Sequence, residues 1–376
     1  MRLPYFALLL MVLVVGCSSP STPAPSTETV PPPPPPTVKT SAAPTATPTL
    51  VIQGPRAPTA QGAPQAVRRL PVLVPDGIGI WGDIANLNSN LNPTVANQTA
   101  QRVQLVSGAA ALSVRQANTQ ALALLTIDAS KPDQVASATQ TGLGAYDGIL
   151  LDQAGIPARA DSLSSTTKLL AALRPVAGVR IILASTYAWS DGAGYAQYTA
   201  DAKSLLSQVD GICICDFLRK KETAPDSFKS VIEWKKDVDA LDQLSRNANT
   251  IVLVATRVAP PQPPPGWDPT QWFKYSLASY LLGVNGPRTY YSYQGLGASG
   301  LILDDDLTVK LGASYGPYYS AYNMYVRQFA KGLVVVNPGT SVAEMPLAQP
   351  YVASNGQQVT SVRLDPQTGA ILRRLP

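Results

Sequence analysis

The sequence predicts an α/β fold, a (β/α)8 TIM barrel with a small C-terminal antiparallel β module. Eight short, largely apolar runs rich in β-branched residues follow residue 67, and helical periodicity separates most of them. The span from Leu70 to Tyr325 holds about 256 residues, close to the ~250 typical of such a barrel. A doubly wound open sheet is the alternative, and the count of eight favours the barrel.

The chain begins with an export signal. Arg2 precedes an apolar run from Phe6 to Val15 that is too short to span a bilayer. The following Gly16-Cys17 completes a string that resembles a bacterial lipobox, which implies cleavage before Cys17 and a lipid on its thiol. An ordinary secretory peptide is the alternative. We expect an exported chain, lipid-anchored to the outer face of the bacterial cell membrane, with residues 1–17 as signal and lipidation site.

Residues 18–66 form a Pro/Ser/Thr-rich tether. Of the 35 prolines in the chain, 14 lie between Pro20 and Pro64, and the only charges of the segment are those of Glu28, Lys39 and Arg56. Such a composition cannot bury a core, so we expect a disordered or semi-rigid linker.

The barrel is expected over residues 67–325. Several of its strand candidates are almost entirely apolar, as strands buried on both faces should be. In chain order they are Leu70–Val74, Arg102–Val106, Ala121–Ile127, Tyr146–Leu151, Val179–Ser185, Val209–Ile214, Thr250–Thr256 and Arg288–Tyr293.

Four amphipathic stretches between these strands predict helices. Pro175 is expected to end the first, and Asp268-Pro269 is a start signal for the last. They are Ser162–Leu173, Tyr195–Val209, Phe228–Leu244, whose apolar stripe includes Ile232, and Thr270–Leu282.

Residues 326–376 predict the β module, packed on the barrel. Turn signals such as Asn337-Pro338-Gly339 and Asn355-Gly356 separate its strands. The strand candidates are Leu333–Val336, Val342–Met345, Gln358–Leu364 and Ala370–Arg373.

Composition excludes several kinds of site. The chain has no histidine, which removes Ser-His-Asp and Cys-His catalysis and His-based zinc sites. Its three cysteines give no disulfide framework, and Cys213 and Cys215, on one strand face, predict buried packing. The net charge of +5 is scattered, so no nucleic-acid partner is expected.

Two motifs do not indicate a ligand. Gly295–Gly300 matches GxGxxG, but no helix pattern opens after it, so a loop is the better interpretation. The run Asp304-Asp305-Asp306 lacks the alternating spacing of a calcium loop. We therefore expect neither a cofactor nor a metal.

Three strand candidates end in acids, at Asp128, Asp152 and Asp216, where barrels carry their active sites. Two of these strands look like copies, because each begins with Asp-Gly. Aligning the copies sets Asp152 opposite Cys215, which leaves Asp216 in the opposite side-chain phase unless the strand ends or bulges there. A carboxylate pair suits glycoside hydrolysis. The alternative is that each Asp is a cap or turn residue.

Aromatic residues cluster near the same strand ends, and flat rings beside carboxylates suit sugar faces. Core or rim packing is the alternative for each ring. The candidates are Trp81, Tyr187, Trp189, Tyr291 and Tyr293.

With these residues in view, the chain resembles glycoside hydrolases of the exported (β/α)8 type, distantly like endo-α-1,4-polygalactosaminidase barrels. The resemblance covers residues 70–376 and rests on Tyr146–Asp152, Leu311–Pro317 and Tyr325–Pro338. It implies a catalytic Asp after strand four, which is Asp152. It also implies a Glu after strand six, where this chain has Cys215, with Asp216 next.

Two functions follow as hypotheses. The first is a cell-surface glycoside hydrolase, a monomer acting on an extracellular or envelope polysaccharide or oligosaccharide through paired carboxylates. The second is a catalytically inactive carbohydrate-binding or envelope scaffold lipoprotein.

Overall fold

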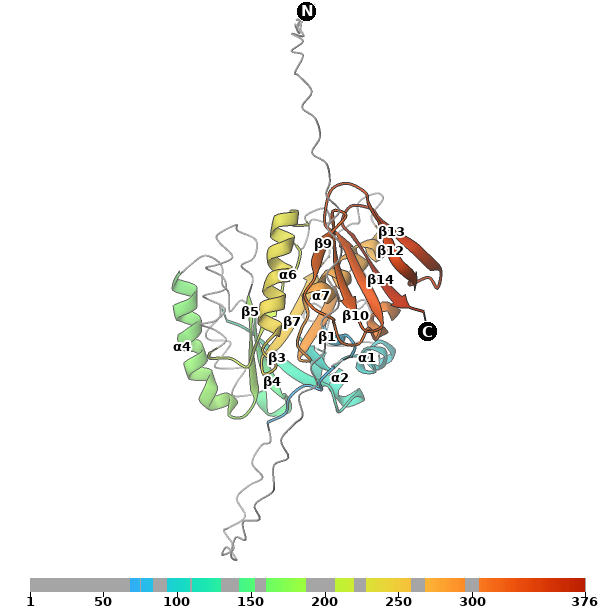
Figure 1. Ribbon diagram of the computed structural model, residues 1–376. Coiled ribbons are helices and arrows are strands. Elements are labelled where there is room, and N and C mark those ends of the chain that lie inside the picture. Colours follow the sequence, from blue (N-terminus) through green and yellow to red (C-terminus); the bar gives the residue numbers. More distant parts are fainter. Residues whose placement is uncertain are drawn as a thin grey trace, which may run out of the picture. The chain divides into compact units, whose positions relative to one another are not determined.

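The computed structural model forms a closed barrel of eight parallel strands, in which each strand pairs with the next in chain order and β8 pairs with β1 (Figure 1). A smaller six-stranded sheet follows. The predicted (β/α)8 barrel with a C-terminal antiparallel module is therefore confirmed. The structure describes residues 68–74, 76–83, 93–108, 110–129, 142–152, 160–186, 207–219, 228–257, 268–294 and 304–375.

Seven of the eight barrel strands overlap their predicted positions. They are β2 (Leu105–Ser107), β3 (Leu122–Asp128), β4 (Gly148–Asp152), β5 (Ile181–Thr186), β6 (Gly211–Ile214), β7 (Ile251–Arg257) and β8 (Thr289–Gln294).

The exception is the first strand. The predicted strand Leu70–Val74 is wrong, because this segment is irregular, with the Tyr290 hydroxyl donating to the Val72 carbonyl over 2.8 Å. Strand β1 is Gly79–Asp83. Its glycines disguise it, yet a Cβ on Gly79 would lie 2.7 Å from the Tyr290 ring and 2.8 Å from the Thr289 carbonyl oxygen. Close strand packing, not β-propensity, selects this residue.

The helices of the described part lie between the strands. They are α1 (Pro93–Ala100), α2 (Ala111–Ala117), α4 (Ala160–Ala177), α6 (Val231–Ser245) and α7 (Pro269–Gly283), with short 3₁₀ turns η1 (Leu143–Ala145) and η2 (Asp305–Thr308). No helix among these residues is long and apolar enough to cross a membrane.

Capping explains where two helices start. The Asp268 side chain accepts from the Thr270 N–H at 2.8 Å, which confirms the start signal of α7. Helix α6 begins three residues later than predicted, because Ser230 and Glu233 form a reciprocal capping box.

Two helix predictions are wrong in detail, and a third falls mostly on residues that the structure does not describe. Pro175 does not end α4, which continues to Ala177, because a proline in the last turn disrupts few bonds. Ile232 is 72% exposed, and Trp234 takes the buried position on α6 instead. Of the predicted helix Tyr195–Val209, residues 195–206 lie outside the described residues.

Side chains of the barrel strands alternate between two cores. All eight strands contribute to an interior cluster that includes Leu150 of β4 and Leu253 of β7. Their neighbours Ile149 and Val252 face the helices. This alternation fixes which residues at the strand ends point into the barrel.

The C-terminal sheet has the order β13-β12-β14-β11-β10-β9. It starts at Tyr319, ahead of the expected boundary at residue 326. Its strands are β9 (Tyr319–Ala321), β10 (Met324–Phe329), β11 (Gly332–Asn337), β12 (Ala343–Val352), β13 (Gln358–Leu364) and β14 (Thr368–Arg374). Residues 62–376 make one compact unit.

This sheet packs on α7. A Cβ on Gly369 would lie 2.5 Å from the Ala278 Cβ, so β14 and α7 meet at van der Waals distance. Arg327 of β10 is 1% exposed and donates to the carbonyls of Leu281, Leu282 and Val284 at 2.6–3.2 Å. It therefore caps the C-terminus of α7, and burial lowers the pKa of its guanidinium to about 10.

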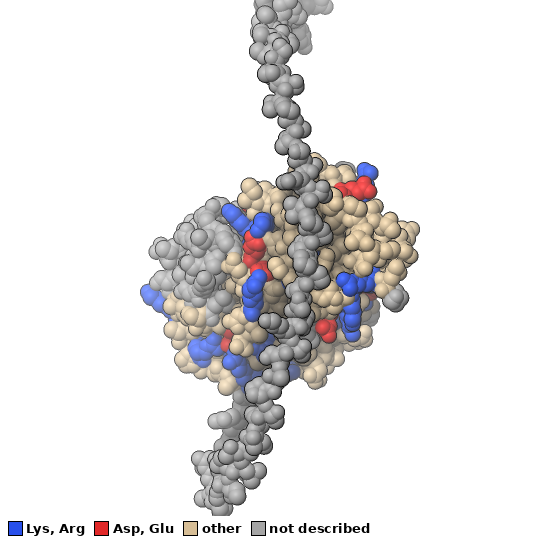
Figure 2. All heavy atoms as spheres, viewed as in Figure 1, with Lys and Arg blue, Asp and Glu red and all other residues tan. Residues whose placement is uncertain are grey.

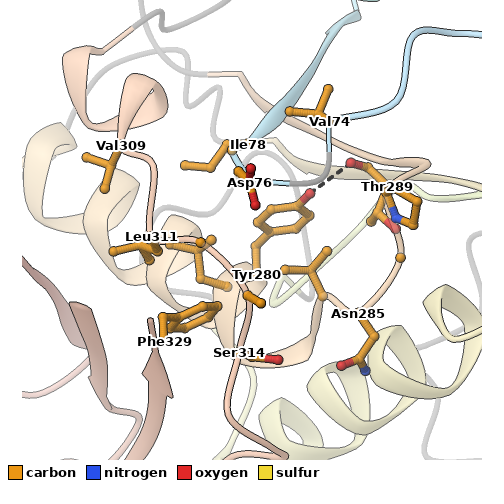
Figure 3. A pocket seen from close by; sticks show the side chains of 17 residues that line it. Val74, Asp76, Ile78, Tyr280, Asn285, Thr289, Val309, Leu311, Ser314 and Phe329 are labelled. Atoms are coloured by element: carbon orange, nitrogen blue, oxygen red, sulfur yellow. Dashed lines mark hydrogen bonds between the residues drawn. The ribbon is translucent and has the colours of Figure 1, made fainter. Parts of the chain in front are cut away.

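The N-terminal end of the barrel, which is the lower end in Figures 1 and 2, carries basic side chains and a cavity. Lys and Arg side chains gather at the lower end of the described part (Figure 2), beside the labels of β3 and β4 in Figure 1. A cavity of about 320 Å³ also opens at the N-terminal end of the strands (Figure 3). Ile78, Leu311 and Phe329 line it, and the Tyr280 hydroxyl donates to the Thr289 carbonyl at its wall.

Candidate active site

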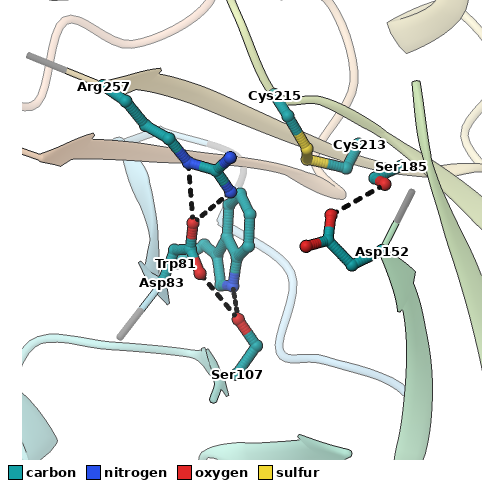
Figure 4. The surroundings of a disulfide bond; sticks show 8 residues. All are labelled: Trp81, Asp83, Ser107, Asp152, Ser185, Cys213, Cys215 and Arg257. Carbon is teal, nitrogen blue, oxygen red and sulfur yellow. Dashed lines mark hydrogen bonds and ion pairs between the residues drawn. A yellow bond between two sulfur atoms is a disulfide. The ribbon is translucent and has the colours of Figure 1, made fainter. Parts of the chain in front are cut away.

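Polar side chains gather at the C-terminal ends of the strands, in phase with the barrel interior (Figure 4). Barrel enzymes carry their chemistry at this end. The set comprises Asp83 of β1, Ser107 of β2, Asp128 of β3, Asp152 of β4, Ser185 of β5, Cys215 after β6, Arg257 of β7 and Gln294 of β8.

Asp83 of β1 and Arg257 of β7 form a buried ion pair over the intervening strand β8. The Arg257 Nη2 lies 2.7 Å from the Asp83 Oδ2, and the two side chains are 11% and 2% exposed. The Ser107 hydroxyl donates to the other carboxylate oxygen at 3.3 Å. Gln294 Nε2 donates to the Asp83 carbonyl at 2.5 Å. Four strands therefore converge on Asp83, which fixes its orientation.

Trp81 lies inside this arrangement and not at the rim after strand one. It is fully buried within β1, and its indole N–H donates to the Ser107 hydroxyl at 3.0 Å (Figure 4). The expected position was wrong because the first strand was placed too early. Its role as a sugar platform stays a prediction.

Asp152 ends β4 with its carboxylate among the same polar groups. The Ser185 hydroxyl of β5 donates to its Oδ1 at 3.1 Å. Asp128 is its register partner on β3. Register partners on parallel neighbours face the same side and lie about 4.8 Å apart. The structure therefore brings Asp128 and Asp152 together.

Cys213 and Cys215 correct one prediction, because they form a disulfide. They lie two residues apart on the same face of one strand, and both belong to the interior cluster. The two cysteines are buried as expected, but the expectation that they form no disulfide is wrong. Cys215 occupies the interior phase that the Asp-Gly alignment assigned to it.

Asp216 lies in the turn after β6 and is half-buried. Its carbonyl accepts from the Arg219 N–H at 3.2 Å and from the Lys229 ammonium at 3.4 Å. Lys229 in turn holds Asp237 at 2.8 Å, with both side chains 1% exposed. Burial raises the pKa of Asp237, and the Lys229 charge opposes that rise. A catalytic role for Asp216 stays a prediction.

The two predicted sugar-binding tyrosines of β8, Tyr291 and Tyr293, do not lie among the polar side chains at the C-terminal ends of the strands. Tyr291 donates its hydroxyl to Ser276 of α7 at 2.8 Å, and the Tyr293 ring lies 5.4 Å from that of Phe273. Both are buried in the helix-facing cluster. Their expected position is wrong, because the interior phase of β8 belongs to Tyr290, the residue just before Tyr291. Tyr187 and Trp189 lie outside the described residues, as does Cys17.

Sequence reasoning missed Asp83, Ser107 and Arg257. Arg257 directly follows the predicted strand Thr250–Thr256, so extending that strand by one residue would have found it. Asp83 ends a strand whose glycines hid it. The available signal was that Asp83 and Arg257 each end a strand and carry opposite charges.

No metal site is built by the described residues, which contain no group of three or more His, Cys, Asp or Glu side chains suited to one ion. Asp304 instead caps η2, accepting from the Asp306 N–H at 2.8 Å.

A family model described as hypothetical glycosyl hydrolase family 15 matches residues 132–333, more than half of the chain. The chain belongs to this family. The match contains Asp152, Ser185, both strand cysteines and Arg257, so most of the polar mouth lies in the part that defines the hydrolase family.

Solved structures similar to this family member include three enzymes of sugar chemistry. A noncanonic maltogenic α-amylase from Thermotoga neapolitana is 9% identical with a TM-score of 0.44, covering 81% of this chain and 99% of its own. A glycoside hydrolase family 5 protein from Bacteroides vulgatus ATCC 8482 is 8% identical with a TM-score of 0.43, at 81% and 93% coverage.

A pullulanase from Anoxybacillus sp. LM18-11 is 10% identical with a TM-score of 0.45, at 84% and 72% coverage. At these identities and scores, none of the three structures carries an argument about the substrate of the chain. No match was found among the curated proteins.

Proposed function

We propose that this chain hydrolyses O-glycosidic bonds of an extracellular or envelope polysaccharide at the C-terminal mouth of its barrel. Lipid on Cys17 holds it on the outer face of the bacterial cell membrane. Membership of a glycosyl hydrolase family supports the reaction class. The pairing of Asp128 with Asp152 on neighbouring strands is the single observation that carries the proposed mechanism.

The spacing of this pair favours a retaining reaction. The backbones of register partners on neighbouring strands lie about 4.8 Å apart, a spacing compatible with the ~5–5.5 Å between carboxyls that a covalent glycosyl intermediate requires. One carboxylate attacks the anomeric carbon while the other, protonated, gives its proton to the departing oxygen. Water then enters, losing a proton to the second carboxylate, and releases the first. Asp152, oriented by Ser185, is the proposed nucleophile.

The Asp83–Arg257 pair has a positioning role in this scheme. Its carboxylate is held by Arg257 and Ser107 and is 3% exposed. Both carboxylate oxygens of Asp83 are therefore occupied by contacts within the protein. We assign it to holding β1, β2 and β7 in register around the acids and to screening their negative charge.

One observation favours a second function, a carbohydrate-binding scaffold without catalysis. The resemblance implies a Glu after strand six, and Cys215 stands there, joined to Cys213. In that case the C-terminal end of the barrel binds sugar but lacks the catalytic acid expected after β6.

Incubation of the purified chain with a panel of polysaccharides, followed by detection of new reducing ends, tests the proposal. We expect hydrolysis of at least one polymer by the parent and none by Asp152→Asn, with both proteins binding that polymer alike. Binding without hydrolysis by the parent supports the scaffold. If the parent neither binds nor hydrolyses any neutral or acidic envelope polymer, that result contradicts both functions.

A further inference from the structure

Five arginines surround the buried Asp147 and the half-buried Asp210 at the N-terminal end of the barrel. Asp147, just before β4, pairs with Arg69 at 2.9 Å and Arg115 at 3.3 Å. Asp210, just before β6, pairs with Arg174 at 3.1 Å and with Arg68. The fifth, Arg180, donates to the Tyr146 carbonyl at 3.0 Å.

The charges are arranged with the cations outward. The arginine side chains that hold the aspartates are 31–51% exposed, whereas the Asp147 and Asp210 side chains are 5% and 12% exposed. Five guanidinium groups against two carboxylates give this group of seven side chains a net charge of +3. Figure 2 shows Lys and Arg atoms gathered there.

Three of the arginines line a hollow. Arg69, Arg115 and Arg180 contribute to a cavity of about 200 Å³, and its lining also includes Asp147, the partner of Arg69 and Arg115, so three guanidinium groups face one carboxylate there. Guanidinium groups bind phosphate oxygens through paired hydrogen bonds. The cavity therefore has the chemistry of a phosphate site.

Exposed apolar side chains interleave with the arginines. Next to Arg68 and Arg69 lie three of them, and two more flank the turn between α4 and β5 close to Arg174 and Arg180. These are Leu70 (40% exposed), Val72 (49%), Leu73 (48%), Val176 (50%) and Val179 (44%). We call the five arginines and these five apolar residues the basal surface.

The described chain starts on the basal surface. Arg68 is its first residue, and 50 residues separate it from Cys17. A chain of that length reaches on the order of 170 Å when fully extended. A lipid at Cys17 would therefore keep the barrel near a membrane without orienting it, so orientation requires a contact of the folded part itself.

We propose that the basal surface docks on anionic phospholipid headgroups. The arginines bind headgroup phosphates, and the interleaved Leu and Val side chains enter the interface, as in other peripheral basic-apolar surfaces. Docking by this end turns the opposite end of the barrel, with Asp128 and Asp152, away from the membrane and toward extracellular polymer.

A bilayer fits the basal surface better than a soluble polyanion does. A nucleic acid or an anionic polysaccharide would use the arginines but leave five exposed apolar side chains without a partner. A bilayer interface uses both kinds of side chain. The start of the described chain on this surface also matches a membrane-held N-terminus.

Vesicle co-sedimentation tests the docking. The full chain carrying Cys17→Ser, which removes the acyl anchor from the comparison, is mixed with phosphatidylcholine vesicles with or without phosphatidylglycerol. We expect a preference for the anionic vesicles that falls as salt rises. Because the N-terminal segment is common to all variants, differences among them report the basal surface alone.

Two variants and two matched controls locate the contact. We expect Arg68→Gln to weaken association with anionic vesicles about fivefold, the effect of one basic residue at a charged surface. Leu73→Asp, at a side chain that is 48% exposed, should weaken it at least as much. The same kinds of change on the C-terminal module, Arg363→Gln and Val342→Asp, should leave it unchanged.

Equal binding to both vesicle types overturns the docking proposal, as does an equal loss in the Arg363→Gln control. Arg68-dependent binding of a soluble anionic polysaccharide, with vesicles ignored, overturns it in favour of a polymer partner. Asp152→Asn should dock as the parent does, so failure of docking and failure of the proposed hydrolysis are separate results.

Discussion

Aspartates serve different purposes at the two ends of this barrel. At the N-terminal end, Asp147 accepts from the Ala123 N–H at 3.0 Å and Asp210 accepts from the Ile182 N–H at 2.8 Å. Each therefore ties its own strand to the preceding one. At the C-terminal end, Asp83 and Asp152 accept instead from serine hydroxyls and face the barrel interior.

Acids at the start of a strand bind backbone N–H groups of the preceding strand, whereas acids at its end lie among the polar side chains that include the proposed nucleophile Asp152. Carboxylates satisfied by backbone N–H groups and exposed arginines are committed to the fold. Asp152, which accepts from the Ser185 hydroxyl, instead faces the barrel interior, where a substrate would bind under the proposed function. The Asp-Gly copies seen in the sequence are thus copies of a strand-start device, and they say nothing of catalysis.

The largest expected effect is at the C-terminal end. Asp128→Asn should lower kcat by about 10²- to 10⁴-fold, the usual worth of a positioned acid or base, with little change in KM. Steady-state kinetics on the polymer identified by screening measures it, with Asp216→Asn as the comparison. If Asp216→Asn abolishes turnover and Asp128→Asn does not, the pair spans β4 and β6 instead.

A smaller effect is expected from glycine at the N-terminal end. A Cβ on Gly211 would lie 2.1 Å from the Ile251 carbonyl oxygen, so Gly211→Ala must displace a strand. We expect a loss of about 1–3 kcal/mol in the free energy of unfolding by urea. Gly144→Ala is the control, since nothing lies within 4 Å of its Cβ position. Equal losses in both variants would contradict close strand packing at Gly211.

Alkaline pH gives the smallest effect, again at the N-terminal end. Burial raises the pKa of Tyr290 above its usual 10, with the Arg288 charge opposing. Its contribution to stability is therefore complete below pH 10 and is lost as the pH rises above 10 toward the folded-state pKa, at about 1.4 kcal/mol per pH unit.

Tyr290→Phe tests this contribution. At pH 8 the variant should be about 1 kcal/mol less stable than the parent, because the hydrogen bond to Val72 is lost. The two stabilities should converge between pH 10 and pH 11 in thermal unfolding. A constant difference across that range would show that the hydroxyl titrates as it does in water.

Apolar periodicity predicted the barrel well and its chemistry only in part. Strands such as Ile251–Arg257 are apolar on both faces, and burial between core and helices imposes that pattern directly. Strand β1 was not recognised because Gly79 is required by close packing against Thr289 and Tyr290, which lie more than 200 residues away in the sequence. Propensity carries no information about such contacts.

The site residues divide in the same way, into those that the sequence predicted and those that depend on contacts between distant parts of the chain. Asp152 was predictable because it ends a clear strand, and its link to Ser185 followed from strand order. The Asp83–Arg257 pair joins residues 174 positions apart, and only the closure of β8 on β1 brings β7 near β1. The phase of Tyr291 depended on one residue of register, which a run of tyrosines does not fix.

The aspartates at the two ends of β4 are expected to serve function at one end and stability at the other. Asp152→Asn and Asp147→Asn make the same change at those ends, and kcat/KM measured beside urea unfolding tests the claim most directly. We predict a loss of about 10²- to 10⁴-fold in kcat/KM with unchanged stability for Asp152→Asn. For Asp147→Asn we predict near-parent kcat/KM with about 1–3 kcal/mol less stability. An active Asp152→Asn beside a folded, inactive Asp147→Asn would contradict the account.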